Sequence, residues 1–198
     1  MLLMTAANKV TSFRFLLCIL YYVLLSMAAG KPSAARDVQL LTIIFILNQI
    51  IAWSDLLDGY LARKYQEVTH FGRIADPLVD KILVVGSFIF FLVLDPLPQI
   101  FKAWFAVVVL GREFLVSGIR GAMEAAGIPF PASVWGKIKT SIQNLTVGFA
   151  LGYAAWIPGS RWAEAVALSL MWATLVATVM SGVTYVMSAR KFLGSERI

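Results

Sequence analysis

Residues 55–80 read DLLDGYLARKYQEVTHFGRIADPLVD, and this stretch joins two long apolar runs of the chain. It contains four aspartates, Asp55, Asp58, Asp76 and Asp80. An ionised carboxylate inside a membrane costs at least ~2.5 kcal/mol on insertion scales. If the flanking runs lie in lipid, the four aspartates have to share a polar cavity with positive charge nearby.

The composition of the chain favours lipid as its solvent. Of the 198 residues, 60% are hydrophobic, whereas apolar residues make up roughly half of an ordinary soluble domain. A bilayer-spanning helix needs about 20 mostly apolar residues, and glycine and proline breaks separate candidate runs of that kind. The runs cover residues 10–29, 38–62, 72–94, 102–123, 136–156 and 162–189. We therefore predict an all-α fold, a polytopic membrane protein with a six-transmembrane-helix bundle, in a single domain over residues 1–198.

Most lysines and arginines fall on one side of these spans. Positively charged loops stay in the cytoplasm, so we expect both termini to be cytoplasmic in an integral protein of the cell (inner) membrane. The residues on the cytoplasmic side are Lys9, Arg14, Arg63, Lys64, Arg73, Arg120, Lys137, Lys139, Arg190, Lys191 and Arg197. Those on the other side are Lys31, Arg36, Lys102 and Arg161. The net charge of +6 then suits anionic lipid headgroups or phosphorylated substrates, and we expect no nucleic-acid partner.

The aspartates form two pairs at helical spacing. Asp55 and Asp58 end the second span, Asp76 and Asp80 begin the third, and each pair lies on one helix face. A short connection makes these helices antiparallel neighbours, so the pairs can converge at the cytoplasmic end. Carboxylates without soft ligands suit Mg²⁺ or Mn²⁺ rather than zinc. The single histidine, His70, cannot form a zinc site alone and is expected in a loop, and the single cysteine lies in an apolar run.

Two small residues, Gly59 and Ala62, share the helix face of the first aspartate pair. Their size leaves room for a ligand beside the metal. Small residues also let membrane helices approach closely, so helix packing is the alternative interpretation for Gly59, Ala62 and Gly72.

The stretch from Asp55 to Asp80 resembles, position for position, the signature D-x2-D-G-x2-A-R-x8-G-x3-D-x3-D of the CDP-alcohol phosphatidyltransferase family. The matching residues are Asp55, Asp58, Gly59, Ala62, Arg63, Gly72, Asp76 and Asp80. Residues 8–14 also look like the family's amino-terminal segment. The resemblance implies a six-helix membrane fold, a homodimer, and a site with two divalent metal ions at the cytoplasmic boundary that binds the CDP headgroup.

The reaction implied by the resemblance transfers a phosphatidyl group from CDP-diacylglycerol to an alcohol, with release of CMP. Asp55, Asp58 and Asp76 would be metal ligands. Asp80 would be the general base and would touch the metal only loosely, because a tightly bound carboxylate is a poor base. The residues expected to bind CDP-diacylglycerol are Asp58, Gly59, Ala62, Arg63 and Gly72, with Arg63 on phosphate.

A second informative stretch, REFLVSGIR, begins at Arg112. Arg112 and Glu113 lie inside an otherwise apolar span, which is unusual unless they face a cavity. Arg112 and Arg120 are two helical turns apart, so both can reach one pocket. Basic side chains suit a phosphorylated acceptor, because an arginine fork matches phosphate geometry. Lys137 and Lys139 follow, and anchoring of the fifth span is the alternative interpretation for them.

This run, together with KIKT at residues 137–140, resembles the phosphatidylglycerophosphate synthases, a branch of the same family whose acceptor is glycerol 3-phosphate. The resemblance implies acceptor-phosphate binding by Arg112, Arg120, Lys137 and Lys139. The partners would then be CDP-diacylglycerol, glycerol 3-phosphate and membrane lipid.

Two alternatives stay open. Within the family, the acceptor could be inositol phosphate, serine or phosphatidylglycerol, and inositol phosphate is the closest rival because it is also anionic. Outside the enzymes, acidic and basic residues inside a membrane could line a cation channel or transporter. That function requires polar residues as far as the opposite leaflet, whereas residues 82–91 read ILVVGSFIFF.

Overall fold

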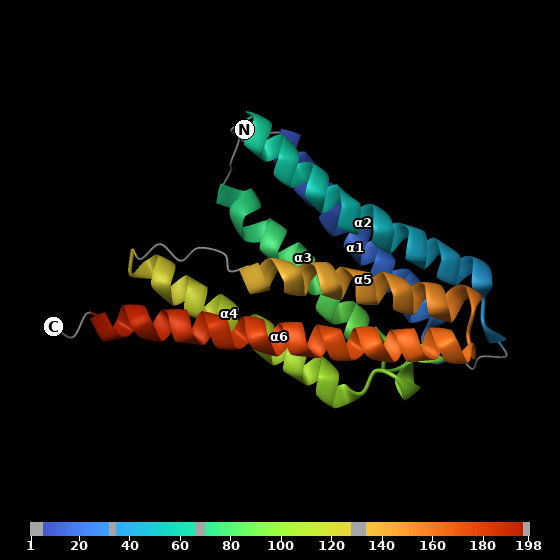
Figure 1. Cartoon of the computed structure of the whole chain (residues 1–198). Helices are drawn as coiled ribbons and strands as arrows, with labels where there is room; N and C mark the ends of the chain where they lie inside the picture. Colours follow the sequence, from blue (N-terminus) through green and yellow to red (C-terminus); the bar gives the residue numbers. More distant parts are fainter. Residues whose placement is uncertain (1–5, 32–34, 66–69, 128–133, 196–198) are drawn as a thin grey trace.

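The structure describes residues 6–31, 35–65, 70–127 and 134–195, and within them the computed structural model forms six α-helices and no β-strand (Figure 1). The helices are α1 (Ala6–Ala28), α2 (Val38–Tyr65), α3 (His70–Phe90), α4 (Ala103–Ala125), α5 (Val134–Trp156) and α6 (Arg161–Ser195). A short 3-10 helix, η2 (Leu97–Gln99), precedes α4. Side chains are described for residues 12–31, 35–54, 78–127 and 134–190. The all-α prediction is confirmed for this part of the chain.

The helices agree with the predicted apolar runs to within a few residues, and the differences have local causes. Helix α6 continues to Ser195, past the end of the predicted apolar run at residue 189, because a helix can extend beyond its apolar stretch. Helix α3 ends at Phe90, because the chain turns there and the Val93 carbonyl accepts a hydrogen bond from Gly30 N–H at 2.9 Å. His70, predicted to lie in a loop, is the first residue of α3.

Helix α5 lies at the centre of the bundle, where it packs against α2, α3 and α6. Helix α4 packs against α3 and α6, and α1 packs against α2 and α3. The contact between α5 and α6 is built from small and hydroxyl-bearing residues: Ala154 and Ala167 are buried, and the hydroxyl oxygens of Thr146 and Thr174 lie 2.7 Å apart. Small residues allow close helix approach, and hydroxyl groups bond across helices without needing water.

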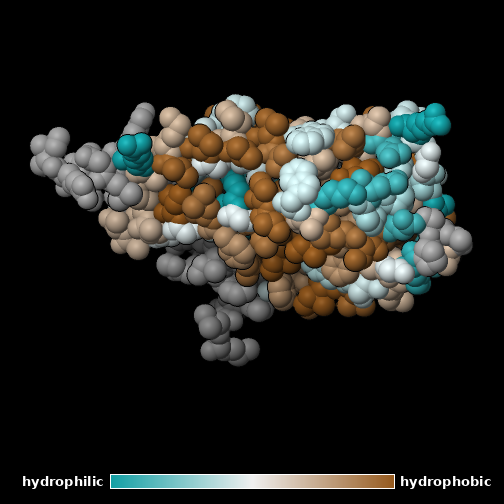
Figure 2. Space-filling view, turned by 90° about the horizontal axis from the view of Figure 1, so that it is seen from below, coloured by the Kyte–Doolittle hydropathy of each residue, from teal (hydrophilic) through white to brown (hydrophobic). Residues whose placement is uncertain are grey.

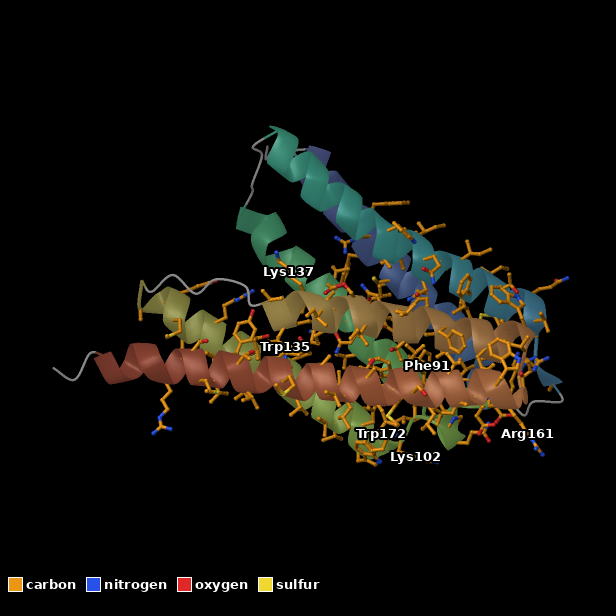
Figure 3. All side chains as sticks on the ribbon, viewed as in Figure 1. Phe91, Lys102, Trp135, Lys137, Arg161 and Trp172 are labelled. Carbon is orange, nitrogen blue, oxygen red and sulfur yellow. The ribbon has the colours of Figure 1, made fainter. Side chains whose placement is uncertain are left out.

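The two ends of the bundle differ in character. Towards the left of Figure 1 lie the starts of α1, α3 and α5 and the ends of α2, α4 and α6. Figure 3 places Lys137 towards this end and Lys102 and Arg161 towards the other. Four phenylalanines whose rings contact one another, mostly edge to face or tilted, lie where α3 gives way to α4, and we call them the aromatic cluster: Phe88, Phe91, Phe101 and Phe105. The alternating directions of the helices thus bring the predicted site residues to the end opposite Lys102 and Arg161.

Large apolar side chains cover much of the surface. Phe114 is 70% exposed and Val107 is 66% exposed. Figure 2 shows apolar side chains over the middle of one face, with hydrophilic ones gathered mainly towards one end. Extended apolar surface of this kind is rare on soluble monomers and marks contact with lipid or with protein.

The length and composition of one helix suit a membrane span, among the residues that the structure describes. It covers Arg161–Arg190, and its most apolar 18-residue stretch has a mean hydropathy of 1.8. Two shorter apolar segments belong to α1 (Ser12–Ala28) and α2 (Val38–Ser54). Six membrane spans therefore stay a prediction.

Candidate functional site

The four aspartates lie on consecutive helices. Asp55 and Asp58 belong to α2, Asp76 and Asp80 belong to α3, and these two helices contact each other. The first three aspartates, together with Gly59, Ala62, Arg63 and Gly72, lie outside the part of the chain whose side chains are described. Within the described part, no group of three or more histidine, cysteine, aspartate or glutamate side chains is placed to hold a metal ion. The metal site and the CDP-diacylglycerol residues therefore stay predictions.

Asp80 does have a described side chain, and it lines a pocket of about 410 Å³ that we call the charged pocket. The four predicted acceptor-phosphate residues line the same pocket. They come from two helices, Arg112 and Arg120 from α4 and Lys137 and Lys139 from α5. The predicted base and the predicted acceptor residues therefore meet in one cavity.

Three charged side chains form a buried network in the wall of the charged pocket. Glu113 Oε1 accepts a hydrogen bond from Arg112 Nη1 at 3.0 Å and another from Lys139 Nζ at 2.5 Å. Arg112, Glu113 and Lys139 are each less than a tenth exposed. A buried charge is costly unless it is paired, and among the described residues the charged pocket is lined by five cationic side chains and two carboxylates. The prediction that Arg112 and Glu113 face a cavity is confirmed, and the network is suited to receive an anion.

Helix α6 contributes Tyr185 to the lining of the charged pocket and accepts hydrogen bonds from both arginines. Arg112 Nη2 donates to Ser181 Oγ, and Arg120 Nη2 donates to the Tyr185 hydroxyl at 3.1 Å. The Tyr185 side chain lines the pocket although only 5% of the residue is exposed. Arg120 is partly buried, whereas Lys137 is exposed at the pocket mouth. The cations therefore range from a fixed, buried arginine to a solvated lysine.

The sequence prediction missed several residues of the charged pocket. Lys81 donates to Ser117 Oγ, and both line the pocket. Lys81 directly follows Asp80, so its position beside the predicted base was a usable signal. Ser181 and Tyr185 are polar residues spaced i, i+4 in an apolar helix, which indicates a shared polar face but not what that face contacts.

A second, larger cavity of about 650 Å³ lies between α2 and α5. It is lined mainly by apolar side chains such as Phe45, Trp53 and Phe149, together with the amides Gln49 and Asn144. We call it the apolar groove. Thr140 and Ser141 line both the apolar groove and the charged pocket, so the two cavities adjoin. A molecule with an apolar part and a charged part can occupy both together.

Known proteins are similar to this chain over most of its length. A family model described as CDP-alcohol phosphatidyltransferase matches residues 4–180. A protein of Mycobacterium tuberculosis (strain H37Rv) named probable phosphatidylglycerophosphate synthase is 32% identical over 191 residues, which cover 96% of this chain and 84% of that protein.

Two further relatives carry the name CDP-diacylglycerol–glycerol-3-phosphate 3-phosphatidyltransferase. The Bacillus subtilis (strain 168) protein is 36% identical over 140 residues, which cover 71% of this chain and 69% of that protein. The Haemophilus influenzae protein is 32% identical over 151 residues, which cover 75% and 76%. The chain belongs to the CDP-alcohol phosphatidyltransferase family.

Proposed function

We propose that this protein transfers the phosphatidyl group from CDP-diacylglycerol to glycerol 3-phosphate, giving phosphatidylglycerophosphate and CMP. One observation carries the choice of acceptor: Asp80 lines the same pocket as two arginines and three lysines. A carboxylate able to accept a proton and a set of cations able to hold a phosphate are the two groups that a phosphorylated alcohol requires. The printed names of the relatives support the same reaction.

The acceptor phosphate would bind in the charged pocket. Arg120 and Lys137 are the more exposed cations and would contact it directly, while Arg112 and Lys139 add charge from the wall. A phosphate at these cations leaves the hydroxyl end of the molecule to face Asp80. The hydroxyl oxygen then bonds to the phosphorus that carries diacylglycerol, the bond from that phosphorus to the bridging oxygen breaks, CMP leaves, and Asp80 takes the hydroxyl proton.

The donor lipid would lie across α2 and α5. Its nucleotide would contact the predicted residues at the end of α2, and its acyl chains would enter the apolar groove, whose lining is mostly apolar. Because the groove adjoins the charged pocket at Thr140 and Ser141, the lipid phosphorus can sit close to the acceptor hydroxyl. Bringing two bound reactants together in this way removes much of the entropic part of the barrier.

Members of this family use divalent metal ions. The predicted donor set consists of carboxylates, which suit Mg²⁺ or Mn²⁺, and Asp80 is the member of the set that lines the charged pocket. Asp55, Asp58 and Asp76 would hold two such ions with Asp80 at their edge. When bound, the ions would neutralise negative charge on the diphosphate.

The same proposal includes the setting of the enzyme. The six helices would all cross the cell membrane, with both termini and the charged pocket at the cytoplasmic face, and residues 1–198 would act as one domain. The exposed apolar side chains and the separation of Lys137 from Lys102 and Arg161 support this arrangement. Two copies of the chain would form a homodimer.

The decisive experiment supplies purified protein with CDP-diacylglycerol, Mg²⁺ and one acceptor at a time, and follows CMP release. The acceptors are glycerol 3-phosphate, inositol phosphate, serine and phosphatidylglycerol. We expect rapid release with glycerol 3-phosphate and little with the other three. Faster release with any of the others would replace the proposed acceptor, and no release with any acceptor would remove the proposed activity.

A further inference from the structure

The two arginines of the charged pocket are long side chains that need support. Arg112 and Arg120 lie two turns apart on α4, and both reach towards α6. An arginine loses much of its rotamer entropy when it is fixed in one conformation. A pocket that holds two arginines in place before the ligand arrives therefore binds more tightly than one that must order them.

Helix α6 provides this support from one face. Ser181 and Tyr185 are spaced i, i+4, so they project from the same side of the helix. Ser181 Oγ accepts a hydrogen bond from Arg112, and the Tyr185 hydroxyl accepts one from Arg120 at 3.1 Å. Each arginine thus has its own acceptor on α6.

The Tyr185 ring contacts both arginines. The guanidinium carbon of Arg112 lies 5.7 Å from the ring centroid and that of Arg120 lies 5.8 Å from it. A cation within about 6 Å of an aromatic centroid is attracted to the ring face. One ring therefore attracts both guanidinium groups. This attraction opposes their mutual repulsion, which would otherwise move them apart.

Gly182 completes the face. A Cβ atom at this position would lie 3.3 Å from Arg112 Cγ, which is tighter than ordinary contact. The absence of a side chain lets the stem of Arg112 lie against α6. Ser181 and Tyr185 therefore hold the two guanidinium groups, and Gly182 makes room for the stem of Arg112. We call these three residues the α6 support face.

We propose that the α6 support face is a specificity-determining element of the enzyme. It positions Arg112 and Arg120 so that the pocket prefers an acceptor carrying a phosphate. The inference rests on the proposed function, since it assigns the arginines to the acceptor. Ser181, Gly182 and Tyr185 are positioning residues and take no part in proton transfer.

The test compares substitutions on the support face with the same substitutions elsewhere. Tyr185→Phe keeps the ring and removes the hydroxyl, Tyr185→Leu removes both, and Ser181→Ala removes the acceptor of Arg112. The matched controls are Tyr21→Phe, on a buried tyrosine of α1 whose hydroxyl lies 2.8 Å from Ser87 Oγ, and Ser188→Ala, on an exposed serine of α6 itself. The KM for glycerol 3-phosphate, the KM for CDP-diacylglycerol and kcat are measured for each.

We expect the KM for glycerol 3-phosphate to rise roughly tenfold in Tyr185→Phe and in Ser181→Ala, as for loss of a hydrogen bond to a charged group. It should rise further in Tyr185→Leu. The KM for CDP-diacylglycerol should change less than twofold, and both controls should match the wild type. The concentration of inorganic phosphate that halves the rate should increase in parallel with the acceptor KM.

Two results would overturn the inference. One is a wild-type acceptor KM in folded Ser181→Ala and Tyr185→Phe protein. The other is an equal rise in both KM values, because a merely structural role of α6 would disturb both substrates alike. Failure of the proposed function would be visible separately, as a wild-type enzyme that releases no CMP with glycerol 3-phosphate, and the inference would fail with it.

Discussion

The aromatic cluster and the charged pocket share helices α3 and α4, and they fill the space between helices in opposite ways. In the aromatic cluster, ring centroids lie 5.0 to 5.9 Å apart and the four phenylalanines are completely buried or nearly so. Two turns further along α4, charged side chains surround a cavity of about 410 Å³. The close-packed region fixes how α3 and α4 meet, and this allows the other region to stay open around its ligand.

The same comparison bears on the channel alternative. A channel needs polar side chains that continue through the bundle. Among the described residues of α3 and α4, the polar lining of the charged pocket gives way to the aromatic cluster, where Phe88 and Phe105 are fully buried. The structure therefore favours a site that opens at one end over a path that crosses the molecule.

Removal of metal should have the largest effect on activity. It should abolish the chemistry at the charged pocket and leave the packing of the aromatic cluster unchanged. EDTA is expected to abolish CMP release, and added Mg²⁺ or Mn²⁺ should restore it. The diphosphate and the aspartates are both negatively charged, so the metal ions have to supply the positive charge between them. The aromatic cluster should be unaffected, so the helical circular dichroism signal should persist in EDTA. Full activity in chelator would refute the metal-dependent mechanism.

Asp80→Asn should have the next largest effect. Loss of a general base typically lowers turnover by about 10²–10⁴-fold, and kcat should fall by this order while the KM for glycerol 3-phosphate changes little. Asp37→Asn is the matched control: Asp37 is exposed, accepts a hydrogen bond from Leu40 N–H at the start of α2, and can be replaced there by asparagine. Similar kcat values for the two variants would remove Asp80 from the base role.

Arg112→Gln should act on acceptor binding rather than on turnover. Loss of one partner of a buried charge pair costs about 2–5 kcal/mol, and this should appear in the KM for glycerol 3-phosphate. Arg112→Lys keeps the charge but loses the planar fork that reaches Glu113 and Ser181 together, so it should rescue only part of the loss. The control is Arg161→Lys, at the opposite end of the bundle, which should have the wild-type KM. Full rescue by Arg112→Lys would show that acceptor binding needs only the positive charge and not the planar fork.

Phe88→Ala should have the smallest effect on catalysis and a large effect on stability. Truncation of a buried phenylalanine costs about 3–5 kcal/mol of unfolding free energy, which a thermal unfolding scan in detergent can detect. Both KM values should stay close to wild type at a temperature where the variant is folded. Phe13→Ala, on an exposed phenylalanine of α1, should change stability far less. A raised acceptor KM in folded Phe88→Ala protein would show that the two regions are coupled.

Sequence reasoning predicted the helices well, because glycine and proline mark the breaks and long apolar runs mark the spans. The family resemblance assigned Asp80, Arg112 and Lys139 to one reaction, and the structure places all three in the lining of one pocket. Sequence reasoning could not find the α6 support face. Ser181 is 69 residues from Arg112 in the chain, and Tyr185 is 65 residues from Arg120, so their contact depends on how α4 and α6 pack. No local spacing rule reports such a contact.

The shared wall at Thr140 and Ser141 has a consequence for the product. The proposed reaction covalently joins the acceptor in the charged pocket to the lipid in the apolar groove. The product, phosphatidylglycerophosphate, would therefore occupy the charged pocket with its headgroup and the apolar groove with its acyl chains. A ligand that binds two sites at once gains avidity. When one part dissociates, the part that is still bound keeps it at high effective concentration beside its site. The product should therefore inhibit the enzyme at lower concentration than glycerol phosphate analogues without tails, and the enzyme would slow as its own membrane fills with product.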